Sequence, residues 1–231
     1  MTSEDYSQVA WWSWPKPNKE SGVTMDRIDE EVRAALKAYN EIAPEFIAQH
    51  ELALRFWSRL INNSGAVVAL ASAGFGSQAA IVHRVSIEHF AFMYALANGT
   101  WTRDQVVQEG EYNNYQYALA LNASLAKDDR EDREGFSSES RQALQDFLKD
   151  PKKKVISAGV NVHNILVKED LKFFHDLYRR LSLHAAHANY VSASWEPDHD
   201  QLLDILTSVK ELLAIATGIW RKKMQVEPDA A

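Results

Sequence analysis

Apolar residues between Met25 and Lys223 recur mostly at intervals of three and four, with little of the two-residue alternation of a half-buried strand. This spacing predicts an all-α fold. We expect an irregular bundle of about seven helices, over residues 25–42, 44–61, 65–97, 103–127, 138–148, 168–194 and 198–224. Thr24 and Thr102 can act as N-caps, and Pro44 suits a first helical turn.

Two interruptions and an N-terminal arm divide the chain. Residues 126–140 are charged and predict an exposed connection, and residues 150–164 predict a loop that holds a short extended piece. Neither stretch has the composition of a flexible linker, so we expect residues 24–226 to form a single helical domain. The Trp-rich arm, residues 1–23, contains the segment "WWSWPKP". Because large aromatic side chains are costly to leave in water, we expect the arm to fold back over the helices or to dock on another subunit.

Composition narrows the function classes. The 231-residue chain has no cysteine, which excludes disulfides, thiolate catalysis and cysteine-ligated metals and fits a cytoplasmic protein. Its formal net charge of −7 argues against a broad DNA-binding face. The sequence has neither the pattern of a secretory signal nor an uncharged apolar run of the ~18 residues that span a membrane, so we expect no membrane partner.

Glu88 is the first candidate residue because a carboxylate is unexpected in its surroundings. It falls in the middle of a helical stripe of otherwise apolar residues, namely Ile81, Val85, Phe92 and Leu96. Arg84, one turn earlier, is its nearest candidate partner. The pair is either a buried ion pair that fixes helix register or part of a functional site. If the pair is buried, Glu88→Ala should cost about 3 to 5 kcal/mol by stranding the arginine.

The predicted helix over residues 168–194 carries the second set of candidates. Its core-facing side consists of apolar residues, namely Leu171, Phe174, Tyr178, Leu181, Ala185 and Ala188. Asp176, Arg180, His184 and His187 follow at spacings of four, four and three, and fall on one strip that faces away from that core. A solvated helix face would give the same strip. Two imidazoles beside a guanidinium are also a usual way to hold a phosphate and move protons near neutral pH. Arg180, His184 and His187 are therefore the candidate catalytic residues.

The segment "RRLSLHAAH" resembles the Arg-x(4 to 6)-His motif of the HEPN superfamily, small helical proteins many of which are metal-independent ribonucleases. Arg179 with His184, and Arg180 with His187, both satisfy the spacing. The resemblance implies an endoribonuclease that acts as a toxin or defence effector. One histidine would take the proton of a ribose 2′-hydroxyl, and the arginine would stabilise charge on the phosphorane. It further implies RNA as the substrate, a site formed across a homodimer, and no metal or other cofactor.

A wider resemblance joins "HRVSIEHF" to "YRRLSLHAAHAN". The pair of segments resembles an uncharacterised bacterial family of unknown function, the 5677 group, over roughly residues 65–195. The shared pattern is an Arg-x-x-x-Glu in one helix and a Tyr-x-x-Leu-Ser followed by a histidine in another. In this chain these positions are Arg84, Glu88, Tyr178, Leu181 and Ser182, followed by either His184 or His187.

The alternative to an enzyme is a non-catalytic helical module that binds a protein partner or a small ligand. In that module Arg84, Glu88 and Tyr178, with their neighbours Arg179 and Ser182, are a binding or structural polar cluster. The geometric test is whether His184 and His187 line a cleft or face bulk solvent singly. The pair His175–Asp176 is similar to one in metal-dependent phosphohydrolases, which require further separated ligands, and we predict no metal site.

Overall fold

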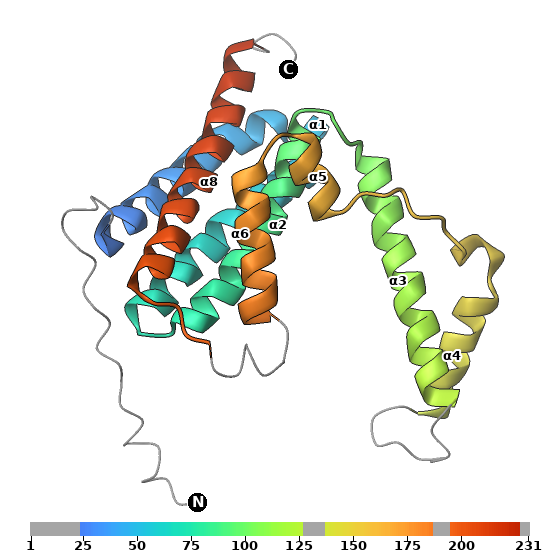
Figure 1. Ribbon diagram of the computed structural model, residues 1–231. Helices are drawn as coiled ribbons and strands as arrows, with labels where there is room; N and C mark the ends of the chain where they lie inside the picture. Colours follow the sequence, from blue (N-terminus) through green and yellow to red (C-terminus); the bar gives the residue numbers. More distant parts are fainter. Residues whose placement is uncertain (1–23, 127–136, 187–194, 227–231) are drawn as a thin grey trace, which may run out of the picture. The chain divides into compact units, whose positions relative to one another are not determined.

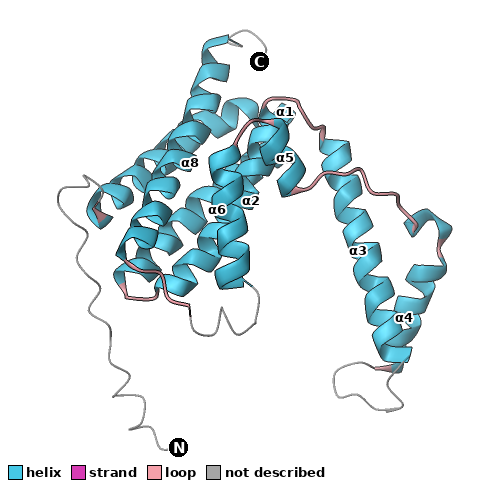
Figure 2. Cartoon of the chain, viewed as in Figure 1, coloured by secondary structure: helices cyan, strands magenta, loops and turns pink. Residues whose placement is uncertain are grey.

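The computed structural model describes residues 24–126, 137–186 and 195–226 (Figure 1). These residues contain seven α-helices and no strand (Figure 2), which confirms the predicted all-α fold class. None of the helices in these residues is both long and apolar enough to cross a membrane.

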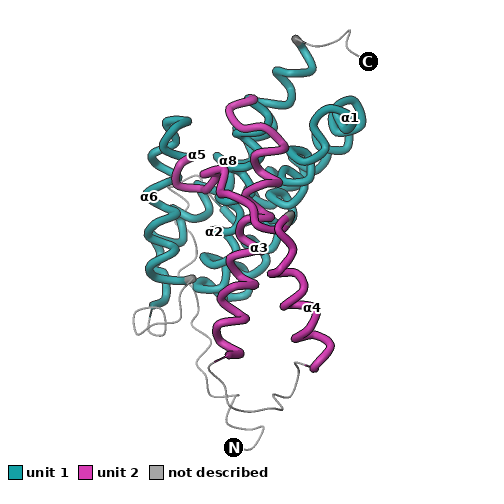
Figure 3. The backbone as a smooth tube through the Cα atoms, turned by 90° about the vertical axis from the view of Figure 1, so that its right-hand side faces the viewer, with its two compact units in different colours: residues 1–98, 165–231 teal, residues 99–164 magenta. Residues whose placement is uncertain are grey.

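The chain forms two compact units, coloured separately in Figure 3. Unit 1 takes residues 1–98 and 165–231, and unit 2 takes residues 99–164. Unit 1 holds α1 (Met25–Ser72), α2 (Gly76–Ala97), α6 (Lys172–Leu181) and α8 (His199–Val226). Unit 2 holds α3 (Arg103–Ala126) and α4 (Ser138–Lys149), while α5 (Val162–Lys168) crosses the boundary. The predicted division into an arm over residues 1–23 and a helical domain over residues 24–226 stays a prediction, because the arm lies outside the described residues.

The core of unit 1 lies between α1, α2 and α8. Trp57 of α1 and Trp220 of α8 are fully buried and stack with their ring centroids 5.8 Å apart. On the other side of α2, Phe90 packs against Phe174 of α6 at 5.4 Å. Burying aromatic rings of this size contributes much of the apolar stabilisation of a helical core. The packing therefore fixes α6, which carries the candidate catalytic residues, against α2.

The structure corrects the predicted helix breaks near the N-terminus. The predicted breaks at residues 43 and 62–64 are absent, because α1 continues through Pro44 to Ser72. Its irregularity is at His50, where φ is −126° and ψ is 25°. The predicted helix over residues 65–97 is instead divided by a turn in which Gly74 adopts a φ of 84°. Glycine tolerates this left-handed conformation, so the chain can turn here. The three-and-four spacing of apolar residues continues before and after the turn, and it therefore gave no sign of the break.

A second correction concerns residues 150–171. The predicted loop over residues 150–164 contains the 3₁₀ turn Pro151–Lys153 and, from Val162, the start of α5, while residues 154–161 between them belong to no helix or strand. The predicted helix from residue 168 begins only at Lys172, because Asp170 has a φ of 56° and ends α5. Both helix caps predicted from the sequence are confirmed: Thr24 Oγ1 accepts from the Arg27 amide, and Thr102 Oγ1 from the Gln105 amide.

Candidate functional site

The candidate residues of the predicted helix 168–194 that the structure describes belong to α6 and to the π-helical turn that follows it, Ser182–Ala186. Phe174, Leu177 and Leu181 form the buried side of α6. Phe174 and Leu181 were predicted on this side, and Leu177 is buried between them. Single π-helical turns are found frequently at functional sites, because the wider turn changes the direction of the side chains beyond it.

Arg84 of α2 is the centre of a polar cluster that joins α2 to α6. Its Nε donates to Ser182 Oγ at 2.8 Å, and its Nη2 donates to Tyr178 Oη at 2.9 Å. The same Nη2 lies 3.1 Å from Glu88 Oε1. Tyr178 Oη donates to that carboxylate oxygen at 3.0 Å, and Ser182 Oγ donates to the Tyr178 carbonyl at 2.8 Å. The structure thus brings Arg84, Glu88, Tyr178 and Ser182 together, while Arg179, which was predicted with them, is exposed and forms none of these bonds.

The electrostatics of this cluster favour a structural role, in which it connects α2 and α6. Burial raises the pKa of the Tyr178 phenol above its ordinary value, and the Glu88 charge raises it further. Tyr178 therefore stays protonated and able to donate to Glu88. The Arg84 guanidinium carbon also lies 4.8 Å from the centre of the Tyr178 ring, a cation–π distance. Because each of these side chains already has a polar partner, the cluster holds two helices together without requiring a ligand.

The predicted Arg84–Glu88 ion pair is confirmed, but the stripe around it was misassigned. The Glu88 side chain is 28% exposed and Ile81 is 40% exposed, so this face is the margin of the core. The buried polar side chains of α2 are His83 and Ser86. Since α2 is apolar around most of its circumference, its sequence pattern does not identify which face is buried.

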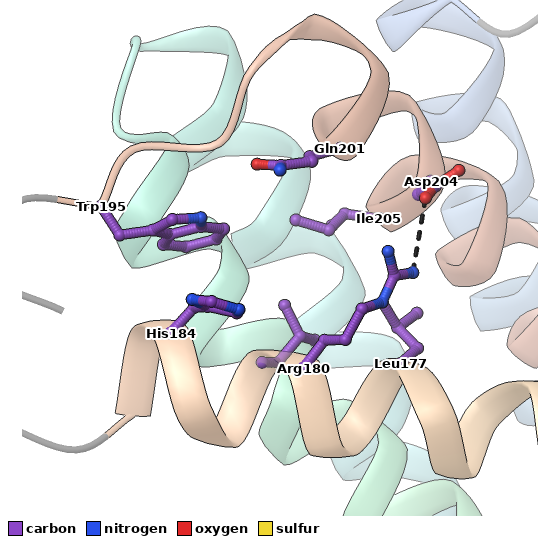
Figure 4. Close-up of a pocket in the computed structure, with 8 residues that line it drawn as sticks. Leu177, Arg180, His184, Trp195, Gln201, Asp204 and Ile205 are labelled. Atoms are coloured by element: carbon purple, nitrogen blue, oxygen red, sulfur yellow. Dashed lines mark hydrogen bonds and ion pairs between the residues drawn. The ribbon is translucent and has the colours of Figure 1, made fainter. Parts of the chain in front are cut away.

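The second group of candidates lines a pocket between α6 and α8 (Figure 4). The pocket has a volume of about 70 Å³ and is lined by Leu177, Arg180, Leu181, His184, Trp195, Gln201, Asp204 and Ile205. Arg180 Nη2 lies 3.4 Å from Asp204 Oδ2, and the two side chains are 54% and 51% exposed. This ion pair is open to solvent, so an anion in the pocket can compete for the guanidinium.

His184 is held in this pocket by an aromatic neighbour. Its ring stacks on Trp195 with the centroids 5.8 Å apart and the planes inclined by 26° (Figure 4). Its Nδ1 is buried and has no hydrogen-bond partner among the described residues. His184 is therefore half-buried, whereas the sequence predicted a side chain that faces away from the core. Stacking fixes the plane of an imidazole in the way that a positioned acid–base group requires.

The pocket takes its arginine and its histidine from different motif pairs, because Arg180 and His184 are separated by three residues and the motif requires four to six. Arg180 shares the pocket with His184, while Arg179 is exposed and does not line it. His187 lies outside the described residues. The geometric test was whether His184 and His187 line a cleft, and of the two His184 does so.

Trp195, Gln201 and Asp204 are pocket residues that the sequence did not identify. They belong to a segment that follows the motif, and no local spacing relates them to it. They come close to Arg180 and His184 only in the folded chain, where α6 and α8 both pack against α2.

The described residues contain no group of three or more His, Asp or Glu side chains placed to hold a metal ion. His175 lies 3.6 Å from its neighbour Asp176, and no further potential ligand joins this pair in the described part of the chain. The chemistry that the pocket offers is that of a guanidinium, an imidazole, a carboxylate and an indole face.

Comparison with known proteins identifies one family. The family of unknown function DUF5677 matches residues 50–201, which is more than half of the 231-residue chain. The match begins within α1 and ends in the first turn of α8, so it contains the whole Arg84 cluster and all but two of the pocket residues. Searches of curated proteins and of solved structures gave no match. By its extent, the family match shows that this chain is a member of DUF5677.

Proposed function

We propose that the pocket between α6 and α8 is the active site of a metal-independent endoribonuclease of HEPN type, acting as a toxin or defence effector. The observation that carries the proposal is that Arg180 and His184 line one pocket, with the imidazole stacked on Trp195. A guanidinium beside a positioned imidazole suits a phosphodiester, which needs charge stabilisation and proton transfer at neighbouring atoms. The indole beside them offers a surface on which a nucleobase can stack.

In the proposed reaction His184 takes the proton from a ribose 2′-hydroxyl. The 2′-oxygen attacks the adjacent phosphorus, and Arg180 stabilises the negative charge on the phosphorane. The bond from phosphorus to the 5′-oxygen then breaks, and that oxygen leaves with a proton. His187, the second histidine of the motif, is the group proposed to supply that proton. The products are a 2′,3′-cyclic phosphate and a free 5′-hydroxyl.

The proposal includes a homodimer, a cytoplasmic location and single-stranded RNA as the substrate. A pocket of about 70 Å³ encloses much less than a nucleotide, so the substrate must extend beyond it. A second copy of the chain beside the pocket would supply further polar groups for a longer segment of RNA. Binding is expected to weaken with salt, as it does wherever lysine or arginine neutralises phosphates.

The test is an RNA-cleavage assay on the full chain with chelator present. Wild type should release 2′,3′-cyclic phosphate ends at a rate that chelator leaves unchanged. Arg180→Ala, His184→Ala and His187→Ala should each lower the rate by roughly 10²-fold or more. Arg179→Ala is the matched control, because it removes an equal charge from the adjacent exposed position outside the pocket. No cleavage by wild type, or equal losses in Arg179→Ala and Arg180→Ala, would refute the proposal.

The second candidate function is a non-catalytic module that binds a protein partner. The observation that favours it is the apolar surface of α3, where Val107, Tyr117 and Leu119 are exposed by 40%, 72% and 39%. The three side chains point in different directions around the helix, so α3 offers a partner apolar contacts on more than one side and not one continuous patch. This function is retained if wild type fails to cleave RNA of varied sequence.

A further inference from the structure

A groove between α1 and α8 in unit 1 is not used by the proposed active site. It has a volume of about 240 Å³ and is lined by Glu31, Ala34, Ala35, Leu213, Ala214, Thr217, Gly218 and Arg221. Ala35 and Leu213 are buried, while Ala34, Ala214 and Gly218 are exposed. The groove therefore has an apolar wall, and the two charged residues that line it are Glu31 and Arg221.

Gly218 indicates that the groove is open to a close approach. A methyl group added at Gly218 would meet no atom of the described protein within 4 Å. Glycine inside a helix costs about 1 kcal/mol relative to alanine. The packing of α8 within the described protein gives no reason for this cost, whereas a side chain seated directly on the α8 backbone would. The position thus fits an occupant that lies outside the described residues.

The volume restricts the size of that occupant. At about 30 Å³ per water in the liquid, 240 Å³ is the space of roughly eight waters. That space is close to one bicyclic aromatic side chain, and it lies below the range of about 300 Å³ at which pockets for drug-sized ligands begin. A single tryptophan indole therefore fits within the groove, whereas a whole helix does not.

The chain itself supplies indoles within reach of the groove. Trp11, Trp12 and Trp14 precede α1, which begins at Met25, by eleven to fourteen positions. An extended segment of ten residues spans up to about 33 Å, and Glu31 lies only six residues into α1, or about 9 Å along its axis. The tryptophan segment can therefore reach the groove without leaving its own protomer.

We propose that the tryptophan segment of the arm, residues 11–14, docks intramolecularly in the α1–α8 groove and inserts one indole beside Gly218. Arg221 at the groove can cover the indole face as a cation–π partner. Glu31 can pair with Lys16, which follows the tryptophans. The arm then acts as an intramolecular cover for apolar surface on two helices that are distant in the sequence.

A disulfide-trapping experiment tests the docking in the full chain. Because the sequence contains no cysteine, Ser13→Cys combined with Ala214→Cys introduces the only two thiols. Ser13 lies between the tryptophans, and Ala214 lines the groove. Under mild oxidation of dilute protein, this pair should form an intrachain disulfide at least ~10-fold faster than the control pair Ser13→Cys with Lys172→Cys. Lys172 is exposed on α6, away from the groove.

A variant that lacks the three indoles shows whether the disulfide depends on them. Replacing Trp11, Trp12 and Trp14 by alanine in the trapping pair should lower its rate to that of the Lys172 control. Equal rates for the groove pair and the control pair would overturn the proposal. A disulfide formed between two chains instead of within one would also overturn it, since the arm would then dock on a second copy.

A thermal measurement gives an independent result. In the variant without the three tryptophans, Gly218→Ala should raise Tm by about 2–4 °C, because alanine favours the helix and the space around it is open. In the otherwise wild-type chain the same substitution should give no gain or a loss, because the methyl group obstructs the docked indole. An equal gain in both backgrounds would contradict docking beside Gly218.

Discussion

His83 of α2 and Ser208 of α8 share a hydrogen bond of 3.0 Å between Nε2 and Oγ in the interior of unit 1. Both side chains are fully buried. Nδ1 of the same ring is buried and has no hydrogen-bond partner among the described residues. Burial lowers the pKa of His83 from its ordinary 6.5 to about 3, so the imidazole joins the two helices in its neutral form.

This pair predicts a loss of stability in weak acid. The unfolded chain takes up a proton at His83 below about pH 6.5, whereas the folded chain does not until about pH 3. The stabilising contribution is therefore complete above pH 6.5 and decreases as the pH falls. Between pH 7 and pH 5 the free energy of unfolding should decrease by about 2 kcal/mol from this group. The measurement is urea unfolding of wild type and of His83→Gln at each pH. The difference between the two proteins isolates the contribution of His83, because the carboxylates titrate alike in both. Parallel pH profiles would show that His83 is not the cause.

Removing Glu88 should destabilise the protein less than a fully buried charge would. Glu88 is paired with Arg84, but its side chain is 28% exposed, and Arg84 keeps its bonds to Tyr178 and Ser182. Glu88→Ala should therefore lower the free energy of unfolding by about 1–2 kcal/mol, and not by the ~3–5 kcal/mol of a stranded buried ion.

The matched control for that measurement is Glu41→Ala. Glu41 forms the same i,i+4 arrangement with Lys37 at 4.0 Å, but both side chains are mostly exposed. Its removal should change the free energy of unfolding by less than about 0.5 kcal/mol. Chemical denaturation measures both variants, and equal losses would show that the Glu88 carboxylate contributes no more than an exposed ion pair does.

The two described catalytic candidates should differ in their effect on stability. His184→Ala removes the stack on Trp195 and should cost about 1–2 kcal/mol, or roughly 3–6 °C in Tm. Arg180→Ala removes an exposed ion pair and should change the free energy of unfolding by less than about 0.5 kcal/mol. Differential scanning calorimetry distinguishes them. If His184→Ala leaves Tm unchanged, the imidazole is not held by Trp195 in solution.

Asp204→Asn should strengthen RNA binding if the pocket is the proposed site. Asp204 lies 3.4 Å from Arg180 and competes with phosphate for the guanidinium. An exposed ion pair of this kind contributes about 0.2–1 kcal/mol, so its loss should tighten binding by roughly 1.5- to 5-fold. Fluorescence anisotropy with labelled single-stranded RNA at fixed salt measures the change, and Glu211→Gln, an exposed carboxylate on α8 outside the pocket, controls for net charge. Weaker binding by Asp204→Asn would contradict competition at Arg180.

The sequence predicted the structure well where a capping residue or the spacing of apolar residues determines where a helix begins. The first residues of α1, α3 and α4 are the predicted ones, and the first two follow capping threonines. The turn at Gly74 and the left-handed Asp170 were not predicted, because each is a single backbone conformation inside an otherwise helical spacing. Apolar periodicity records which residues face the core and carries little information on where the chain turns.

The two polar sites differ in how far the sequence could reveal them. Arg84 and Glu88 are one helical turn apart, so their ion pair follows from spacing alone. Trp195 and Asp204 meet His184 and Arg180 only through the packing of α8. The buried pair His83 and Ser208 is separated by 125 residues, and nothing in either local segment indicates the other. Contacts between distant segments depend on how helices are arranged, and a single sequence contains no direct signal for that arrangement.

The division of unit 1 between residues 1–98 and 165–231 bears on the order in which the chain can fold during synthesis. Trp57 emerges from the ribosome early, but its stacking partner Trp220 is made more than 160 residues later. A nascent chain therefore holds an unsatisfied aromatic surface on α1 until α8 has been translated and released. Unit 2, which is contiguous in the sequence, is complete before that moment. Completion of the core therefore waits for α8, and a chain that stops short of Trp220 leaves Trp57 without its stacking partner.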